Sequence, residues 1–318
     1  MLSHREIMPH RVDDYTFGGP AVQAIGLSKR YGSFDALIDL HLSIAAGQVF
    51  GLLGPNGAGK TTFIRTLLGF IFPTSGRVLV LGIDPAVHPV AVKRQVAYLP
   101  GDARLPREMR GMSVLRFFAD MQGEGDFERS LAVAKRLDLD LHRFVGFMST
   151  GMRQKLAIAV VMGSRAPLLI LDEPTANLDP TVRGNVLEMV REARNDGRTV
   201  ILSSHVMSEI EEVCDSVAFL RLGRLALEQS LELLKQRHRI VGRISPDHII
   251  DVPHRLRSLV ESISREGERV SINTTGDLSP LLRWLESLEL KQMRVEAFGL
   301  SAVYDAIHHG GESSEVAR

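Results

Sequence analysis

A glycine-rich run, GPNGAGKTT at residues 54–62, constrains the fold of this chain more than any other feature. It follows the continuously apolar run Val49–Leu53, which is typical of a strand buried on both faces, and it leads into a helix-like segment from Lys60. The run fits the pattern G-x-x-x-x-G-K-[ST], whose backbone N–H groups wrap phosphates. This order of strand, loop and helix predicts a parallel α/β sheet.

The loop supplies several kinds of predicted contact. Lys60 would reach the β- and γ-phosphates of a nucleotide, and the Thr61 hydroxyl would bind Mg²⁺. Substitution of Lys60 should therefore remove nucleotide binding or turnover. The predicted nucleotide-binding residues of the loop are Gly54, Pro55, Asn56, Gly57, Ala58, Gly59, Lys60, Thr61 and Thr62.

Two further apolar runs end in residues that suit phosphate chemistry. Asp172 and Glu173 follow the run 168–172, where Asp172 is predicted to hold the metal and Glu173 to polarise a water as general base. His205 follows the run 199–203 and should emerge at the same sheet edge, where it could contact the γ-phosphate or serve only a structural role. Tyr31 could stack on a base, although packing is the commoner role for such an aromatic residue.

The segment Ser149–Gln154 opens an apolar helix and has two possible interpretations. Ser149 and Gly151 could grip an anion at the positive helix end, with a hydroxyl and backbone N–H groups. The alternative is an ordinary N-terminal helix cap.

Composition narrows the class of protein. Among 318 residues, Lys plus Arg and Asp plus Glu both number 38, so no global charge favours nucleic acid or anionic lipid. The single Cys214 cannot form an internal disulfide, which suits a reducing cytoplasm. No apolar run reaches the roughly 20 residues of a membrane span.

The chain divides into three predicted regions. Residues 1–20 read as a flexible leader, and residues 21–237 as a nucleotide-binding domain with antiparallel strands near 21–47 and a helical subdomain at about 103–163. Residues 238–318 read as a small α+β accessory domain and tail, with a strand at 270–273 and a helix at 280–288. We expect a regulatory or dimer-supporting role for it.

Taken together, the motifs resemble those of the nucleotide-binding subunit of ATP-binding cassette (ABC) transporters, over roughly residues 21–235. The resemblance implies a P-loop NTPase fold with a mixed sheet, an antiparallel β subdomain and a helical subdomain. It also implies that Tyr31 stacks on adenine, that residues 54–62 form the Walker A loop, and that Asp172 and Glu173 are the Walker B acid and the catalytic base.

The same resemblance assigns roles across a dimer. Asp179 matches the dimer-contact loop, and His205 matches the switch histidine. Ser149 and Gly151 match the phosphate-contacting positions of the family signature, which would touch the ATP held by Lys60 of the other subunit.

Two departures from the family pattern stand out. The signature Leu-Ser-Gly-Gly-Gln is replaced by MSTGM at residues 148–152, a form similar to that of drug, lipid and antibiotic exporter ATPases, and this favours export. Gly101 replaces the glutamine that usually follows Tyr-Leu-Pro. We hypothesise that Asp102, the next residue, takes over part of the metal or water contact.

The resemblance implies an ATPase that uses ATP and Mg²⁺ and drives a separate integral-membrane permease. It would work as a dimer, most simply a homodimer, in the cytoplasm on the inner face of the cell membrane. An importer ATPase and a cassette that moves a non-transport partner remain alternatives. A cassette acting on nucleic acid is disfavoured, because charge is balanced and the chain holds one Walker A pattern.

Overall fold

The computed structural model describes residues 19–121, 126–246, 248–297, 299–301 and 304. Residues 1–18 of the leader expected at 1–20, and most of the expected tail, therefore lie outside the described residues. Within the described ranges, no helix is both long enough and apolar enough to cross a membrane.

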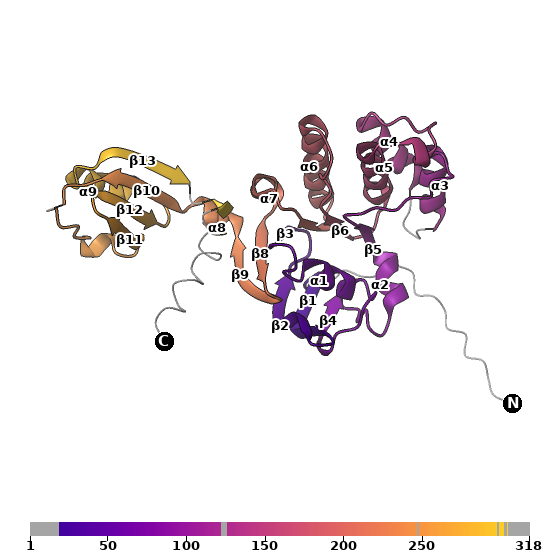
Figure 1. Ribbon diagram of the computed structural model, residues 1–318, viewed down its shortest axis with the longest axis horizontal. Coiled ribbons are helices and arrows are strands. Elements are labelled where there is room, and N and C mark those ends of the chain that lie inside the picture. The colour runs from indigo at the N-terminus through magenta and orange to yellow at the C-terminus, as the bar shows by residue number, and fades with distance from the viewer. Residues whose placement is uncertain (1–18, 122–125, 247, 298, 302–303, 305–318) are drawn as a thin grey trace.

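A six-stranded sheet forms the centre of the larger part of the molecule (Figure 1). Its order is β5-β6-β7-β3-β8-β9, and neighbouring strands are parallel except for the pair β8 and β9. This confirms the predicted parallel α/β core. In sheet order the strands are Val96–Leu99 (β5), Leu168–Asp172 (β6), Thr199–Ser203 (β7), Val49–Leu53 (β3), Ser216–Arg221 (β8) and Arg224–Ser230 (β9).

Both faces of this sheet are covered, which explains why its central strands are continuously apolar. Side chains alternate between the faces: Val49 and Leu53 of β3 join one core, and Phe50 and Leu52 join the other. Helices α6 and α7 lie above the sheet in Figure 1, whereas α1 lies below it. The helices of these layers are Lys60–Leu67 (α1), Pro89–Gln95 (α2), Thr150–Gly163 (α5), Pro180–Asn195 (α6) and Met207–Val213 (α7).

A three-stranded antiparallel sheet closes the face beside α1. Its order is β2-β1-β4, with Phe34–Ile44 (β2), Val22–Tyr31 (β1) and Ser75–Val80 (β4). Its apolar side chains share one core with α1 and the lower face of the central sheet. The expected antiparallel strands near 21–47 are thus present, and they hold the start of α1 in place from below.

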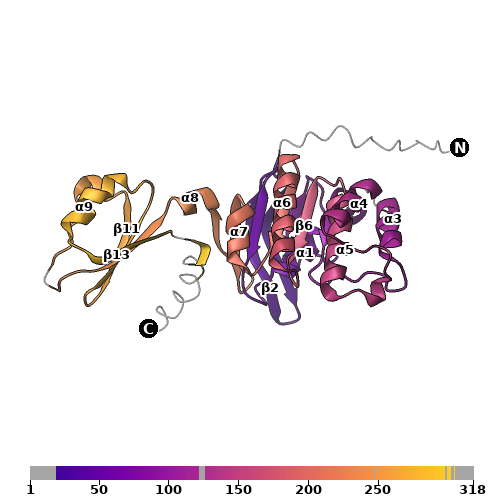
Figure 2. The same ribbon diagram turned by 90° about the horizontal axis from the view of Figure 1, so that it is seen from above.

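A helical block follows β5 and carries its own apolar core. It comprises α3 (Gly111–Met121), α4 (Phe127–Arg136), the 3-10 turn Val145–Phe147 and α5. Arg136 of α4 reaches Glu188 and Glu192 of α6 at 2.6 and 2.8 Å. Figure 2 shows α3, α4 and α5 grouped at one end of the molecule.

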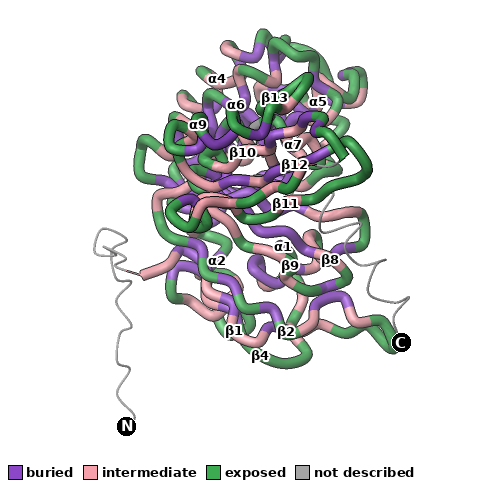
Figure 3. Tube along the Cα trace, turned by 90° about the vertical axis from the view of Figure 1, so that its left-hand side faces the viewer, coloured by how far each residue is buried: buried purple, intermediate pink, exposed green. Residues whose placement is uncertain are grey.

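The accessory region lies at the opposite end (Figures 1 and 2) and is built on a four-stranded antiparallel sheet. The predicted strand at 270–273 and helix at 280–288 are found as β12 and α9, but three further strands were not expected. Buried residues run through the interior of both parts, and outer turns are exposed (Figure 3). The accessory region follows the connecting helix α8 (Leu231–Lys235). In sheet order its strands are β11 (Val260–Glu266), β12 (Arg269–Thr274), β10 (His238–Arg243) and β13 (Lys291–Ala297), and its helix is α9 (Leu282–Ser287).

After β13 the chain returns to the larger part of the molecule, which is built on the six-stranded sheet. Leu300 is fully buried in the core that α6 and α7 share with the central sheet. Its N–H donates to the Glu211 carboxylate of α7 at 2.5 Å. A residue that follows the accessory sheet in sequence therefore packs into the core of the larger part of the molecule.

Candidate nucleotide-binding site

The glycine-rich loop connects β3 to α1 and requires glycine on steric grounds. Gly54, Gly57 and Gly59 have positive φ angles of 147°, 80° and 108°, which side-chain-bearing residues rarely adopt. A Cβ on Gly59 would lie 2.6 Å from the carbonyl oxygen of Ala36 in β2. The Ala36 carbonyl group of the antiparallel sheet therefore leaves no room for a side chain at Gly59.

Lys60 begins α1, and its side chain folds back over the loop. Its Nζ donates to the carbonyl oxygens of Gly54 at 2.5 Å and Pro55 at 3.2 Å. Burial lowers the pKa of Lys60, while the negative charges of Glu173 and Asp172 oppose this shift. The ammonium group therefore lies within the field of both acids, where it can exchange loop carbonyls for phosphate oxygens.

Asp172 ends β6 and is buried, and the Ser203 hydroxyl at the end of β7 donates to its carboxylate. Ser203 Oγ also accepts the N–H of Glu173 at 3.2 Å. Glu173 has a positive φ of 52°, so the chain turns sharply after Asp172. Both acids line the smaller of the two cavities described below.

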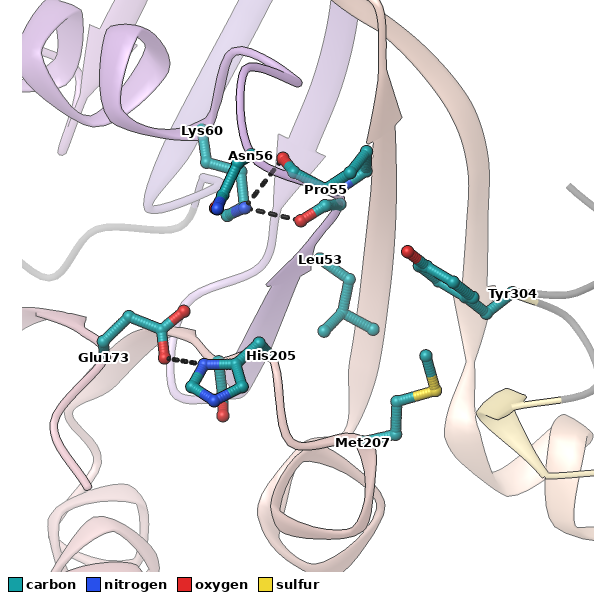
Figure 4. Close-up of a pocket in the computed structure, with 10 residues that line it drawn as sticks. Leu53, Pro55, Asn56, Lys60, Glu173, His205, Met207 and Tyr304 are labelled. Carbon is teal, nitrogen blue, oxygen red and sulfur yellow. Dashed lines mark hydrogen bonds and ion pairs between the residues drawn. The ribbon is translucent and has the colours of Figure 1, made fainter. Parts of the chain in front are cut away.

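Glu173 and His205 meet across the sheet edge. His205 Nδ1 lies 2.7 Å from a carboxylate oxygen of Glu173 (Figure 4). The His205 side chain is 75% exposed and that of Glu173 is 26% exposed, so the pair faces solvent with its reactive atoms accessible. The ring is held by a carboxylate and remains open to a ligand.

Two cavities border the loop. The larger, of about 650 Å³, brings Lys60, Glu173 and His205 together with the apolar side chains of Leu53, Met207 and Tyr304 (Figure 4). The smaller, of about 360 Å³, is lined by Phe34, Ala36, loop residues 55–62 and both acids. Every predicted residue of the loop, together with Asp172, Glu173 and His205, thus lines a cavity in the described structure.

The Ser149–Gln154 segment lies elsewhere. Ser149 caps α5, with its hydroxyl accepting the Met152 N–H at 3.2 Å, and neither Ser149 nor Gly151 is among the described residues that line the two cavities. A Cβ on Gly151 would lie 3.0 Å from the Asn177 carbonyl oxygen. Within a single chain, Ser149 therefore acts as an N-terminal helix cap. The helix end remains available to bind an anion.

Tyr31 and Asp179 also lie outside both cavities. Tyr31 ends β1 with its ring exposed, and Lys29 Nζ lies 5.0 Å from the ring centroid. Asp179 caps α6 by accepting the Val182 N–H at 3.0 Å. The structure therefore gives Asp179 a local role as helix cap, while one face of Tyr31 remains open for stacking.

Gly101, rather than Asp102, is the residue that approaches Asp172, the predicted metal ligand. A Cβ on Gly101 would lie 3.8 Å from the Asp172 carboxyl carbon. The Asp102 carboxylate instead pairs with Arg104 at 3.2 Å, and both side chains are strongly exposed. A side chain at position 101 would therefore contact Asp172 directly, whereas the side chain at position 102 does not.

Comparison with known proteins places this cassette in a family. A family described as ABC transporter matches residues 37–176. Over 253 residues the chain is 33% identical to the Nod factor export ATP-binding protein I of Mesorhizobium japonicum, covering 78% of this chain and 74% of that protein. The chain belongs to the ATP-binding subunits of ABC transporters. It is accordingly an ABC ATPase.

Other relatives of this ABC ATPase extend the match. It is 32% identical to the daunorubicin resistance ATP-binding protein DrrA2 of Streptomyces coeruleorubidus, across 89% of this chain and 91% of that protein. A solved structure described as an ATP-binding subunit of an ABC transporter is 31% identical, with a TM-score of 0.63 over 67% of this chain and 90% of that one. The predicted cassette fold is thereby confirmed.

Several polar residues at the site of this ABC ATPase were not predicted from its sequence. Gln154 Nε2 donates to the Pro174 carbonyl oxygen at 3.0 Å, and Ser203 orients Asp172 as described above. Thr175 and Ser204 both donate to the buried carboxylate of Glu209. Their contacts depend on the burial of Glu209 and mostly join segments far apart in sequence, so no local sequence pattern signals them.

Proposed function

We propose that this ABC ATPase acts as a homodimer that binds two MgATP molecules and drives export through a separate membrane permease. The observation that supports a dimer is that the predicted phosphate-binding groups lie in two separate places on the chain. Lys60, Glu173 and His205 share a cavity, whereas Ser149 and Gly151 lie outside it. A second copy would bring its Ser149 to the ATP held by Lys60.

In this proposal the hydrolytic residues act on a water molecule in line with the γ-phosphate. The water oxygen attacks phosphorus, Glu173 accepts the water proton, and ADP leaves with the electrons of the broken P–O bond. Lys60 stabilises the charge on the phosphate oxygens. His205, which Glu173 holds in place, donates to the γ-phosphate.

The donor set also suits Mg²⁺. The Thr61 hydroxyl and the Asp172 carboxylate line the same cavity, and oxygen ligands of this kind are those that Mg²⁺ prefers. The bound ion would neutralise phosphate charge. Asp172 is kept in orientation by Ser203, and Gly101 lies next to Asp172. We propose that Asp102, the next residue, moves toward Asp172 to contact the ion or its water.

The remaining sites complete nucleotide recognition. We assign adenine stacking to the exposed ring of Tyr31, which leaves the base at the edge of the antiparallel sheet. Asp179 would contact the second copy near its Walker A loop. Both residues are accessible from outside the cassette core.

Export is supported by the relatives, whose names refer to Nod factor export and daunorubicin resistance. Docking of a permease on the cytoplasmic membrane face is supported by exposed apolar side chains within residues 70–90. Phe70, Phe72, Val87 and Val90 are each more than half exposed, and Lys93 of α2 lies 4.6 Å from the Phe70 ring centroid. Apolar surface of this kind marks interaction sites.

The test combines turnover and assembly. Purified chain should hydrolyse ATP, and Lys60→Ala should abolish this. Glu173→Gln should retain ATP and elute as a dimer from a sizing column when ATP is present. A Glu173→Gln variant that binds ATP and stays monomeric would refute the dimer, and copurification from detergent-solubilised membranes without a permease would count against transport.

A further inference from the structure

Helix α7 begins two residues after His205 and turns a charged side chain into the protein interior. Glu209 is 6% exposed. Burial of a carboxylate is costly unless it is hydrogen-bonded, and the partners of Glu209 therefore indicate what the residue does.

Two buried hydroxyl groups converge on one oxygen of Glu209. Thr175 Oγ1 donates to Oε2 at 2.7 Å, and Ser204 Oγ donates to the same oxygen at 2.9 Å. Thr175 is 3% exposed and Ser204 is 2% exposed. The other oxygen, Oε1, is buried with no hydrogen-bond partner among the described residues.

Each hydroxyl belongs to a segment that carries a site residue. Thr175 lies two residues after Glu173, in a turn where the Ala176 N–H binds the Glu173 carbonyl oxygen at 3.2 Å. The same turn continues through a bond from the Leu178 N–H to the Thr175 carbonyl oxygen at 3.3 Å, directly before Asp179.

The second hydroxyl fixes the other segment. Ser204 Oγ accepts the Val206 N–H at 3.0 Å and so holds the bend at which His205 projects. Glu209 therefore connects the turn after Glu173 with the bend that presents His205.

We propose that Glu209 is a positioning residue for ATP hydrolysis, which sets Glu173 and His205 relative to each other through Thr175 and Ser204. This inference rests on the proposed function. It also gives residues 175–179, which would meet the second copy, a direct mechanical connection to His205. Movement of that segment on dimer closure would reach His205 through two hydrogen bonds and one buried carboxylate.

The primary test is the kinetics of Glu209→Ala, measured per folded enzyme. Misplacement of reacting groups by about 1 Å costs about 100-fold in rate. We expect kcat to fall about 10- to 100-fold, with the ATP dissociation constant within about twofold of wild type, because the described hydrogen bonds of Glu209 go to Thr175 and Ser204 and not to the Walker A loop. Glu212→Ala on the same helix is the matched control, since Glu212 pairs with Arg191 at the surface and kcat should be unchanged.

A double-mutant cycle separates positioning from stability. Thr175→Val should lower kcat, and Thr175→Val combined with Glu209→Ala should be no worse than Glu209→Ala, because both act through one contact. If Glu209→Ala fails to fold, Glu209→Gln replaces it: its amide oxygen can keep both hydrogen bonds while the charge is removed, so kcat should be intermediate.

The outcomes distinguish two failures. Absence of ATP hydrolysis by the wild-type chain would overturn the proposed function itself. Hydrolysis by wild type with equal kcat in Glu209→Ala, or additive losses in the cycle, would overturn only the positioning role. A parallel loss of ATP binding would also overturn it, since that would place the effect in the nucleotide pocket.

Discussion

At the scale of single residues, the site is held by side chains that orient other side chains. Ser203 orients Asp172, His205 pairs with Glu173, and Glu209 joins the segments on either side of that pair. The reactive groups of a P-loop enzyme contribute mainly by position and charge. Substitutions at the orienting residues should therefore affect turnover more than ATP affinity.

Asp102 offers a residue-scale prediction about the altered loop at 100–102. Its ion pair with Arg104 involves side chains that are 82% and 90% exposed, and breaking such a pair costs at most about 1 kcal/mol. Little energy therefore opposes a movement of the Asp102 carboxylate toward Asp172 when nucleotide binds. We expect Asp102→Ala to lower the ATPase rate and its stimulation by the permease.

Arg104→Ala is the control for Asp102→Ala, because it removes the present partner and keeps the carboxylate. It should retain wild-type ATPase activity in the same assay. Equal activity in both variants and in wild type would show that Asp102 does not contribute to hydrolysis.

At the scale of elements, the helices of the cassette contain two glycines in opposite surroundings. A Cβ on Gly163, at the end of α5, would lie 2.7 Å from the Cα of Ser130 in α4, whereas a Cβ on Gly184 in α6 would meet nothing within 4 Å. Gly163 therefore sets the close packing of α4 on α5. Gly184 sets no such contact, and it affects stability only by increasing the flexibility of the unfolded chain.

Substitution of these glycines by alanine should have opposite effects on stability. Gly163→Ala overpacks the α4–α5 contact and should destabilise by about 1–3 kcal/mol. Gly184→Ala should stabilise by about 0.5–1 kcal/mol, because alanine is the better helix former. Thermal unfolding followed by circular dichroism checks both, and a lowered melting temperature for Gly184→Ala would contradict this account.

The same scale shows which elements the sequence could predict. The strands β3, β6 and β7 occupy the residues expected for them, because strands covered on both faces are continuously apolar. The chemistry-bearing residues at their ends followed from those positions. The site could therefore be located without coordinates.

Three of the four accessory strands could not be predicted in this way. β13, with the sequence KQMRVEA, is exposed at each position for which burial is described, and Gln292 within it has a positive φ of 52°. Only its pairing with β10 makes it a strand. Such edge strands depend on tertiary contacts more than on local pattern. The contacts of Glu209 were missed for the same reason, since they join segments 34 and 5 residues away.

At the scale of the whole molecule, the accessory region and the cassette are joined through Leu300, which is fully buried in the cassette core. Leu300→Ala should destabilise the cassette by about 2–4 kcal/mol, as expected for a buried leucine. The only tryptophan, Trp284, is buried in the accessory core, so its fluorescence reports that region separately.

Urea unfolding followed by two signals checks this prediction. Leu300→Ala should shift the transition seen by circular dichroism and leave the Trp284 transition in place. Leu282→Ala is the control, because Leu282 is 58% exposed on α9 and its loss should change neither transition by more than about 0.5 kcal/mol. A Trp284 transition that moves with the first would show that the two parts unfold as one unit.

A shared active site makes a sharper prediction about the assembled molecule. If each ATP lies between Lys60 of one copy and Ser149 of the other, a heterodimer of Lys60→Ala with Ser149→Arg has both defects in one site and neither in the second. A heterodimer of the doubly substituted chain with wild type has one defect in each site. Heterodimers isolated through two different affinity tags should therefore hydrolyse ATP in the first combination and not in the second. The reverse pattern, with activity in the second combination and none in the first, would mean that each chain completes its own site, because the two substitutions would then disable a site only within the chain that carries them.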